Sequence, residues 1–197
     1  EAVKGLFSKR QKLFIHADQV KQMLTAIDFV KEFGFDVVIA GGADSWQIAP
    51  LLKEYQIPVV LNAQHNLPST EDEDYDQPYK TPAILQQAGV LFALNDDANN
   101  ARYRNLAFNA GTAAAFGLSK GQALSAITLN TAKILGIDNR TGSIEAGKDA
   151  NIIISEGDIL DMRTSIITHA IIQGRLVDLR SKQTQLFDRY MSKYDLQ

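Results

Sequence analysis

Apolar residues form two kinds of pattern along the first half of this chain. Short segments rich in apolar residues, which predict strands, occur at 12–17 (KLFIHA), 36–40 (DVVIA), 58–62 (PVVLN) and 90–94 (VLFAL), and the run at 36–40 is typical of a strand covered on both sides. Between these runs, apolar residues recur at helical spacing, which predicts helices from Val20 to Gly34, over 46–55 and over 81–87. This alternation of strands and helices predicts a parallel sheet whose strands are joined by crossover helices.

The second half of the chain has a different order of elements. A polar stretch at 64–79, which contains the acidic run 71–76, predicts a loop before the fourth strand. Beyond that strand the pattern predicts an Ala-rich helix at Gly111, a single further helix from Ser119 to Ile137, a buried strand at 151–154, a β-rich run at 166–177 with a turn at Gly174, and an amphipathic helix at 183–194.

Composition excludes several classes of function. The chain has 197 residues, 45% of them hydrophobic, and a net charge of −3, with acidic and basic residues interspersed. It therefore lacks the basic patch that nucleic-acid binding needs. It has no cysteine, which excludes disulfides and thiolate metal sites. No apolar run approaches the ~20 residues of a membrane helix. These features are compatible with the periplasm or the cytoplasm of a bacterium.

Three consecutive motifs in the second half carry a family resemblance. They are TLNTAKILGI at 128–137, TGSIEAGKDANIII at 141–154 and IIQGRLVD at 171–178. Their succession resembles the C-terminal signature of the amidohydrolase superfamily, within it the imidazolonepropionase-like group. The resemblance implies an α/β fold, the second half of a (β/α)8 TIM-type barrel followed by strands of a small β-sandwich. The boundaries would be 1–140 for the half-barrel, 141–180 for the β-domain and 181–197 for a C-terminal helix.

The resemblance also implies a metal site at the carboxyl ends of the strands, where parallel barrels place their reactive groups. His16, in FIHAD, matches the family's metal-binding histidine on the fifth strand. A neutral imidazole at a strand end suits zinc or another divalent metal. The alternative is a histidine that the fold retains without a metal.

The second strand departs from the family pattern. Where relatives place a His-Gly pair, this sequence has Gly41 and Gly42. Glycine has no side chain that could bind a metal, so we do not expect a binuclear site, although a mononuclear site needs fewer ligands. The glycine pair is either a tight turn or a place where backbone N–H groups meet an anionic substrate group.

Adjacent aspartates follow the fourth strand, in VLFALNDD. By position, Asp97 takes the place of the aspartate that in relatives binds the metal and accepts the proton of the attacking water. Asp96 would face substrate, or would take that role after a small shift. The alternative interpretation is a solvated loop.

Two further residues follow strand ends. Asp44 comes after the second strand and His65 after the third, and both are predicted to face substrate. A solvent-exposed loop histidine is the more common situation, so this interpretation of His65 competes with a role without any ligand.

These expectations give two hypotheses of different classes. In the first, the protein hydrolyses a non-peptide carbon–nitrogen bond of a small molecule, an amide, imide or cyclic amide, with metal-activated water. The family's first-strand histidine pair is absent, so we expect the chain alone to be inactive, with the other half-barrel supplied by an N-terminal half of the same protein or by a homo-oligomer. In the second hypothesis, the protein is a binding or structural module that has lost the metal. A free-standing small-molecule-binding α/β domain is a third possibility.

Overall fold

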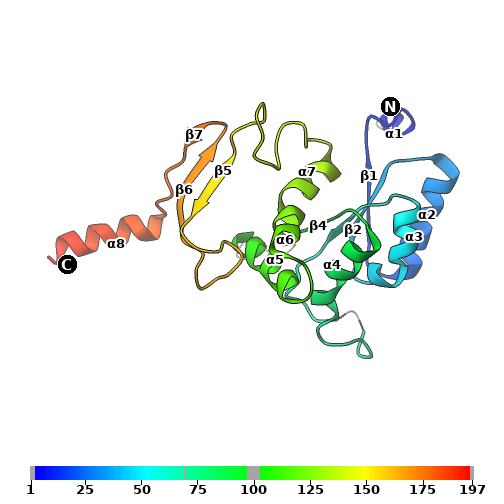
Figure 1. Cartoon of the computed structure of the whole chain (residues 1–197), viewed down its shortest axis with the longest axis horizontal. Coiled ribbons are helices and arrows are strands. Elements are labelled where there is room, and N and C mark those ends of the chain that lie inside the picture. The colour runs from blue at the N-terminus through cyan, green and yellow to red at the C-terminus, as the bar shows by residue number, and fades with distance from the viewer. Residues whose placement is uncertain (1–2, 69, 97–102, 196–197) are drawn as a thin grey trace.

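The computed structural model describes residues 3–68, 70–96 and 103–195 and contains two sheets (Figure 1). The first has four strands in the order β1-β2-β3-β4, and the second has three strands in the order β5-β6-β7. None of the helices within these ranges combines the length and apolar character that crossing a bilayer requires. The α/β class with a parallel sheet, predicted from the sequence, is confirmed.

The four-stranded sheet is parallel throughout. Its strands are β1 (Leu13–Ala17), β2 (Val37–Gly41), β3 (Val59–Leu61) and β4 (Phe92–Leu94). Across the sheet, four residues lie level with one another in register: His16, Ala40, Val60 and Ala93. Because parallel strands end at the same edge, the four loops that follow them gather there. Closure of the sheet into a barrel is not seen in the described residues, where β1 and β4 each pair with one strand only.

Helices from the connections cover one face of this sheet (Figure 1). They are α2 (Val20–Phe33), the 3₁₀ helix η1 (Ser45–Ile48), α3 (Ala49–Glu54) and α4 (Gln77–Ala88); a short α1 (Lys4–Phe7) precedes β1. Gly34 ends α2 in the left-handed conformation, as its position after the apolar period predicts. The predicted loop at 64–79 is three residues too long, because α4 begins at Gln77 and Pro78 in its first turn favours a helix start.

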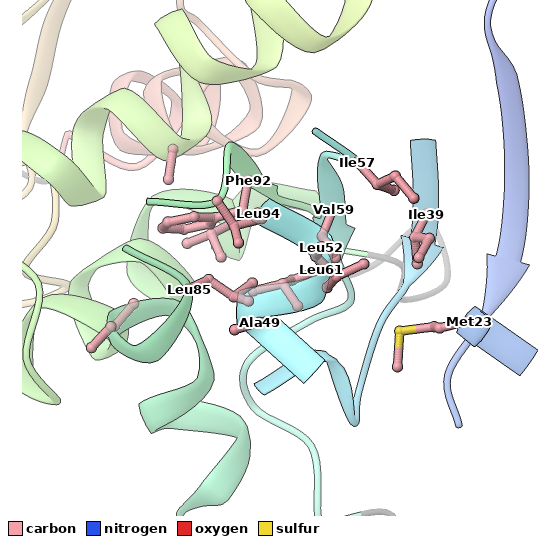
Figure 2. Close-up of a cluster of buried hydrophobic side chains, with 14 of the residues drawn as sticks. Met23, Ile39, Ala49, Leu52, Ile57, Val59, Leu61, Leu85, Phe92 and Leu94 are labelled. Carbon is pink, nitrogen blue, oxygen red and sulfur yellow. The ribbon is translucent and has the colours of Figure 1, made fainter. Parts of the chain in front are cut away.

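The hydrophobic core lies between the sheet and these helices (Figure 2). Every second strand residue points into it, as the side chains of Ile39, Val59 and Phe92 show. Met23 of α2 and Leu52 of α3 pack against these strand residues from the helix side, and both are fully buried. Continuous apolar runs were therefore a sound indicator of these strands.

Three helices follow β4: α5 (Leu106–Ala115), α6 (Lys120–Ile127) and α7 (Leu129–Leu135). Helices α5 and α6 add to the large core, whereas α7 packs against the opposite face of the sheet. Ile134 of α7 forms a small cluster with Val38, Ala93 and Val60 on this face. The single helix predicted over 119–137 is wrong, because the backbone at Thr128 leaves the helical conformation (φ −132°, ψ −91°) and turns α7 toward the sheet.

Lys12 ties the start of β1 to the end of α7. Its ammonium donates to the carbonyl oxygens of Ile134 at 2.5 Å and Lys133 at 3.4 Å. A cation at these last helical carbonyls also matches the helix dipole. We expect Lys12→Met to lower the free energy of unfolding by about 1 kcal/mol in urea denaturation. Lys21→Met, on exposed α2 surface, is the control and should cost less than about 0.5 kcal/mol; equal effects of both changes would contradict the assignment.

The second sheet is antiparallel and consists of β5 (Ile152–Ser155), β6 (Ile167–Ile172) and β7 (Arg175–Leu176). The predicted turn at Gly174 is confirmed, with positive φ at both Gln173 and Gly174 as a two-residue hairpin requires. The strand predicted as buried at 151–154 is exposed instead, with Ile153 58% accessible. The described residues form one layer of sheet, so the predicted sandwich is not seen.

Helix α8 (Lys182–Lys193) extends away from both sheets (Figure 1). It buries none of its residues, and Leu186, Phe187 and Tyr190 are exposed. The amphipathic pattern thus predicted the helix correctly, although its apolar side has no cover from the described residues.

Candidate functional site

His16 lies at the carboxyl edge of the parallel sheet, on the face away from the large core. Its neighbours Ile15 and Ala17 belong to the helix-side core, so alternation places the His16 side chain on the opposite face. The imidazole is exposed and makes no hydrogen bond to any described residue. His16 thus lies near the end of a strand, as the sequence predicts, and its role as a metal ligand stays a prediction.

Two asparagines belong to the same face. By the same alternation, Asn62 follows Val60, and Asn95 follows Ala93, toward the carboxyl edge. Their backbones continue the sheet, since Asn62 N donates to Gly41 O at 3.3 Å and Asn95 N to Leu61 O at 2.9 Å. These two asparagines were not predicted as site residues, although the alternation of buried positions along β3 and β4 places them on this face.

The glycine pair is a tight turn held by its surroundings. Gly41 and Gly42 have φ of +109° and +67°, and Gly42 N donates to Ala17 O at 2.8 Å. A Cβ on Gly41 would lie 2.5 Å from the carboxylate of Asp18, and one on Gly42 would lie 2.6 Å from Val59. The turn interpretation therefore accounts for both glycines, and the Gly42 N–H is not available for an anion.

Asp44 is engaged at the start of α2. Its Oδ2 accepts a hydrogen bond from Val20 N at 3.3 Å, while its Oδ1 is buried and has no partner among the described residues. A carboxylate at a helix N-terminus stabilises that helix. The predicted role of Asp44 in substrate binding stays a prediction, and its observed contact is with the fold.

His65 is held by helix α5. Its Nε2 lies 2.7 Å from Thr112 Oγ1, and its backbone N–H donates to Asn109 Oδ1 at 3.2 Å. Asn109 Oδ1 also accepts from Gln64 N at 2.9 Å, and its amide donates to Asn105 O at 3.1 Å. Asn109 is 1% exposed. Sequence analysis missed Asn109 and Thr112, because no local pattern relates them to a loop more than 40 residues away.

Two aspartates follow β4, and the structure describes only the first of them, Asp96. Asp96 is buried, and its Oδ2 has no partner among the described residues. Such a carboxylate oxygen is an acceptor for an N–H, an O–H or a cation. Asp97, predicted as metal ligand and base, lies outside the described residues.

Two cavities open near these loops. One of about 310 Å³ is lined by Asp18, Gly41, Asn62, Gln64 and residues at the start of α4. The other, of about 480 Å³, lies between α5 and the loop that carries Asp158 and Arg163, and His65 lines it. His16, Asp44 and Asp96 line neither cavity. The described residues thus place the predicted site residues at one edge without enclosing them in one pocket.

An ion pair is part of the lining of the 480 Å³ cavity. Arg163 contacts Asp161 through two nitrogens, at 3.1 and 2.8 Å, and these hydrogen bonds lower the Asp161 pKa to about 2. A lowered carboxyl pKa means that the contact is complete above pH about 4 and is lost as the pH falls through about 2.

We expect Arg163→Gln to raise the Asp161 pKa toward its usual value, measured as the midpoint of its carboxyl carbon shift in an acid titration. Since the backbone N–H of Arg163 remains as a donor to Asp161, the return should be partial. Arg180→Gln, a change at the separate Asp178 pair, is the control and should leave the Asp161 midpoint near 2. An Asp161 midpoint near 2 in Arg163→Gln would show that the guanidinium is not the cause.

The described residues do not form a metal centre by themselves. Within 3–68, 70–96 and 103–195, no three His, Cys, Asp or Glu side chains gather closely enough to hold an ion. His16 has the right donor type, but one imidazole is too few for zinc, which takes three or four protein ligands. Further donors would have to come from residues outside the described part.

We compared the sequence and the structure of this chain with those of known proteins. The results agree with the order of strands and with the motifs of the second half. The family model for the Amidohydrolase family matches residues 53–178. The chain belongs to the amidohydrolase family. Proteins of this family hydrolyse carbon–nitrogen bonds and generally use divalent metals, so the resemblance stated from the sequence motifs is confirmed.

Individual relatives of this chain support the narrower, imidazolonepropionase-like group. An imidazolonepropionase from Picrophilus torridus is 31% identical over 163 residues, which are 77% of this chain and 37% of that protein. One from Thermoplasma volcanium is 30% identical over 118 residues, 56% of this chain and 29% of that protein. The crystal structure of an amidohydrolase from Thermotoga maritima superposes with a TM-score of 0.78 at 34% identity, over 90% of this chain and 46% of that one. The chain spans less than half the length of these proteins.

Proposed function

We propose that this chain provides the second half of the barrel of an amidohydrolase that cleaves a non-peptide carbon–nitrogen bond in a small molecule, an amide, imide or cyclic amide. The observation that carries the proposal is His16, an exposed imidazole at the carboxyl end of β1 on the face away from the helices. The similarity of the chain to proteins named imidazolonepropionase supports the choice of a non-peptide substrate.

A complete barrel would bring the two edges of this sheet toward a common centre. His16 on β1 and the loop after β4 are three strand spacings apart, about 14 Å along the sheet. Curvature into a closed barrel shortens this separation. The face of the sheet that carries His16 is only partly covered, and Phe14 on it is 43% exposed. This exposure favours a complete barrel, in which further strands come from the same polypeptide or from a second copy.

In the proposed site, a divalent metal, zinc being the first candidate, would supply an acidified water. His16 would hold the metal through one imidazole nitrogen, and Asp97 would hold it and accept the proton of the water. Asn62 and Asn95, on the same face, would orient the substrate by hydrogen bonds. Asp96 and Asp44 would contribute substrate contacts, the former through its unpaired oxygen.

The test is hydrolysis by the full-length gene product. A panel of amides, imides and lactams is assayed for release of amine or carboxylate, with His16→Ala, Asp97→Asn and His169→Ala compared with the parent. His169 lies on β6 in the other sheet, so its replacement is a matched control. We expect His16→Ala and Asp97→Asn to lower the rate by about 10³-fold and His169→Ala to leave it unchanged. Equal rates in all variants would contradict the roles of His16 and Asp97.

The second candidate function is a binding or structural module without a metal. The observation that favours it is the Gly41–Gly42 turn, whose packing leaves no space for a ligating side chain at Gly41. In that case the gene product would hydrolyse none of the compounds in the panel. Its metal content would also be the same with and without His16.

A further inference from the structure

We propose that Asn109 and Thr112 position His65 so that its Nδ1 accepts a hydrogen bond from the N–H of a neutral amide or imide ligand. The ligand class rests on the proposed function; the positioning of His65 does not. In this proposal His65 binds the ligand, and Asn109 and Thr112 act through His65.

The first step is the anchoring of the His65 backbone. A single buried oxygen, Oδ1 of Asn109, accepts from two consecutive backbone N–H groups, those of Gln64 and His65. The Asn109 amide is in turn fixed by its bond to Asn105 O. A buried oxygen with two donors determines the path of the loop after β3, because moving the loop would leave buried N–H groups without partners.

The second step is the orientation of the imidazole ring. Thr112 lies three residues after Asn109, on the same side of α5, and its hydroxyl is 2.7 Å from His65 Nε2. That hydroxyl has one proton, which it donates to Phe108 O at 3.1 Å. It therefore accepts from His65, so Nε2 carries the proton and Nδ1 is the free acceptor of the neutral ring.

The third step is the chemistry of the cavity that His65 lines. Its walls include the apolar side chains of Phe108, Leu118, Leu160 and Met162. Its charges occur as two ion pairs, Lys120 with Asp158 at 2.6 Å and Arg163 with Asp161 at 2.8 Å. Paired charges, an apolar lining and one imidazole acceptor favour a small neutral ligand with an N–H group over an ionic one.

The tautomer is tested by NMR on the full chain with ¹⁵N-labelled histidine at pH 8, where a free imidazole is neutral. The chain has three histidines, so His65→Gln identifies the His65 signals by their loss. We expect His65 to show a protonated Nε2 and an unprotonated Nδ1, with a detectable Nε2 proton. Thr112→Val should abolish that proton signal, and Thr112→Ser, which keeps the hydroxyl, should restore it. Asn109→Ala, which removes the acceptor of the Gln64 and His65 N–H groups, should weaken it. A protonated Nδ1 in the parent, or the same signal in Thr112→Val, would overturn the positioning.

The ligand class is tested by titration with succinimide, which has an N–H, and with N-methylsuccinimide, which does not. We expect the Nδ1 resonance of His65 to shift with succinimide only, and Thr112→Val to weaken that binding at least fivefold without a change in the unfolding transition. Equal responses to both compounds, or none to either, would overturn the inference. Neither readout needs a metal or turnover, so a failure here is separate from a failure of the hydrolase proposal.

Discussion

Replacing Gly41 by histidine, the change that would restore the family's sequence pattern, is expected to destabilise the protein by about 3 kcal/mol or more. Gly41 has φ +109°, which L-residues rarely adopt, and a Cβ there would collide with the Asp18 carboxylate. That carboxylate is the acceptor for Ala43 N, so displacing it would also disturb the turn. The free energy of unfolding in urea measures the effect.

Ala40→His is the matched control for this change. Ala40 is level with His16 in the sheet and lies on the same face, at strand spacing of about 4.8 Å. We expect this variant to fold with a loss below about 1.5 kcal/mol and to be stabilised by added Zn²⁺, an effect lost when His16 is also replaced by Ala. A Gly41→His protein as stable as the parent would show that the glycine turn is not required.

Phe92→Ala is expected to cost about 3–5 kcal/mol, the range for deleting a fully buried aromatic ring. Phe92 of β4 is 0% exposed and belongs to the hydrophobic cluster in Figure 2. Phe187→Ala is the control, because Phe187 of α8 is exposed, and it should cost less than about 0.5 kcal/mol. Similar losses for both changes, measured by urea denaturation, would contradict the assignment of the core.

The strands were predictable because their signal is local. The runs VVIA at 37–40 and PVVL at 58–61 contain only apolar residues, a pattern typical of a buried strand or a buried helix, and they are too short for a helix. The Gly34 helix end and the Gly174 turn were predictable for a similar reason, since each needs a backbone conformation that glycine adopts easily.

The errors arise where distant contacts decide the structure. The helix break at Thr128 lies inside a good helical pattern, and the packing of Ile134 against Val38 and Ala93 accompanies it. The exposure of Ile153 depends on what covers the second sheet, which an apolar run cannot specify. Tertiary context overrides local preference in both cases.

The candidate site was predictable only in part. His16 could be placed because it lies near the end of a predicted strand, and its face follows from alternation. The contacts of His65 with Asn109 and Thr112 join residues 44 and 47 positions apart, so no motif indicates them. The roles of His16, Asp44, His65, Asp96 and Asp97 in catalysis or binding stay predictions.

Metal analysis of the full-length gene product, purified without chelator, tests the central claim most directly. Plasma mass spectrometry on the parent, His16→Ala, Asp97→Asn and the His169→Ala control gives the metal content per chain. The hydrolase account predicts a stoichiometric divalent metal in the parent and in His169→Ala, and its loss in His16→Ala and Asp97→Asn. A parent protein without metal, or full metal content in both site variants, would contradict it.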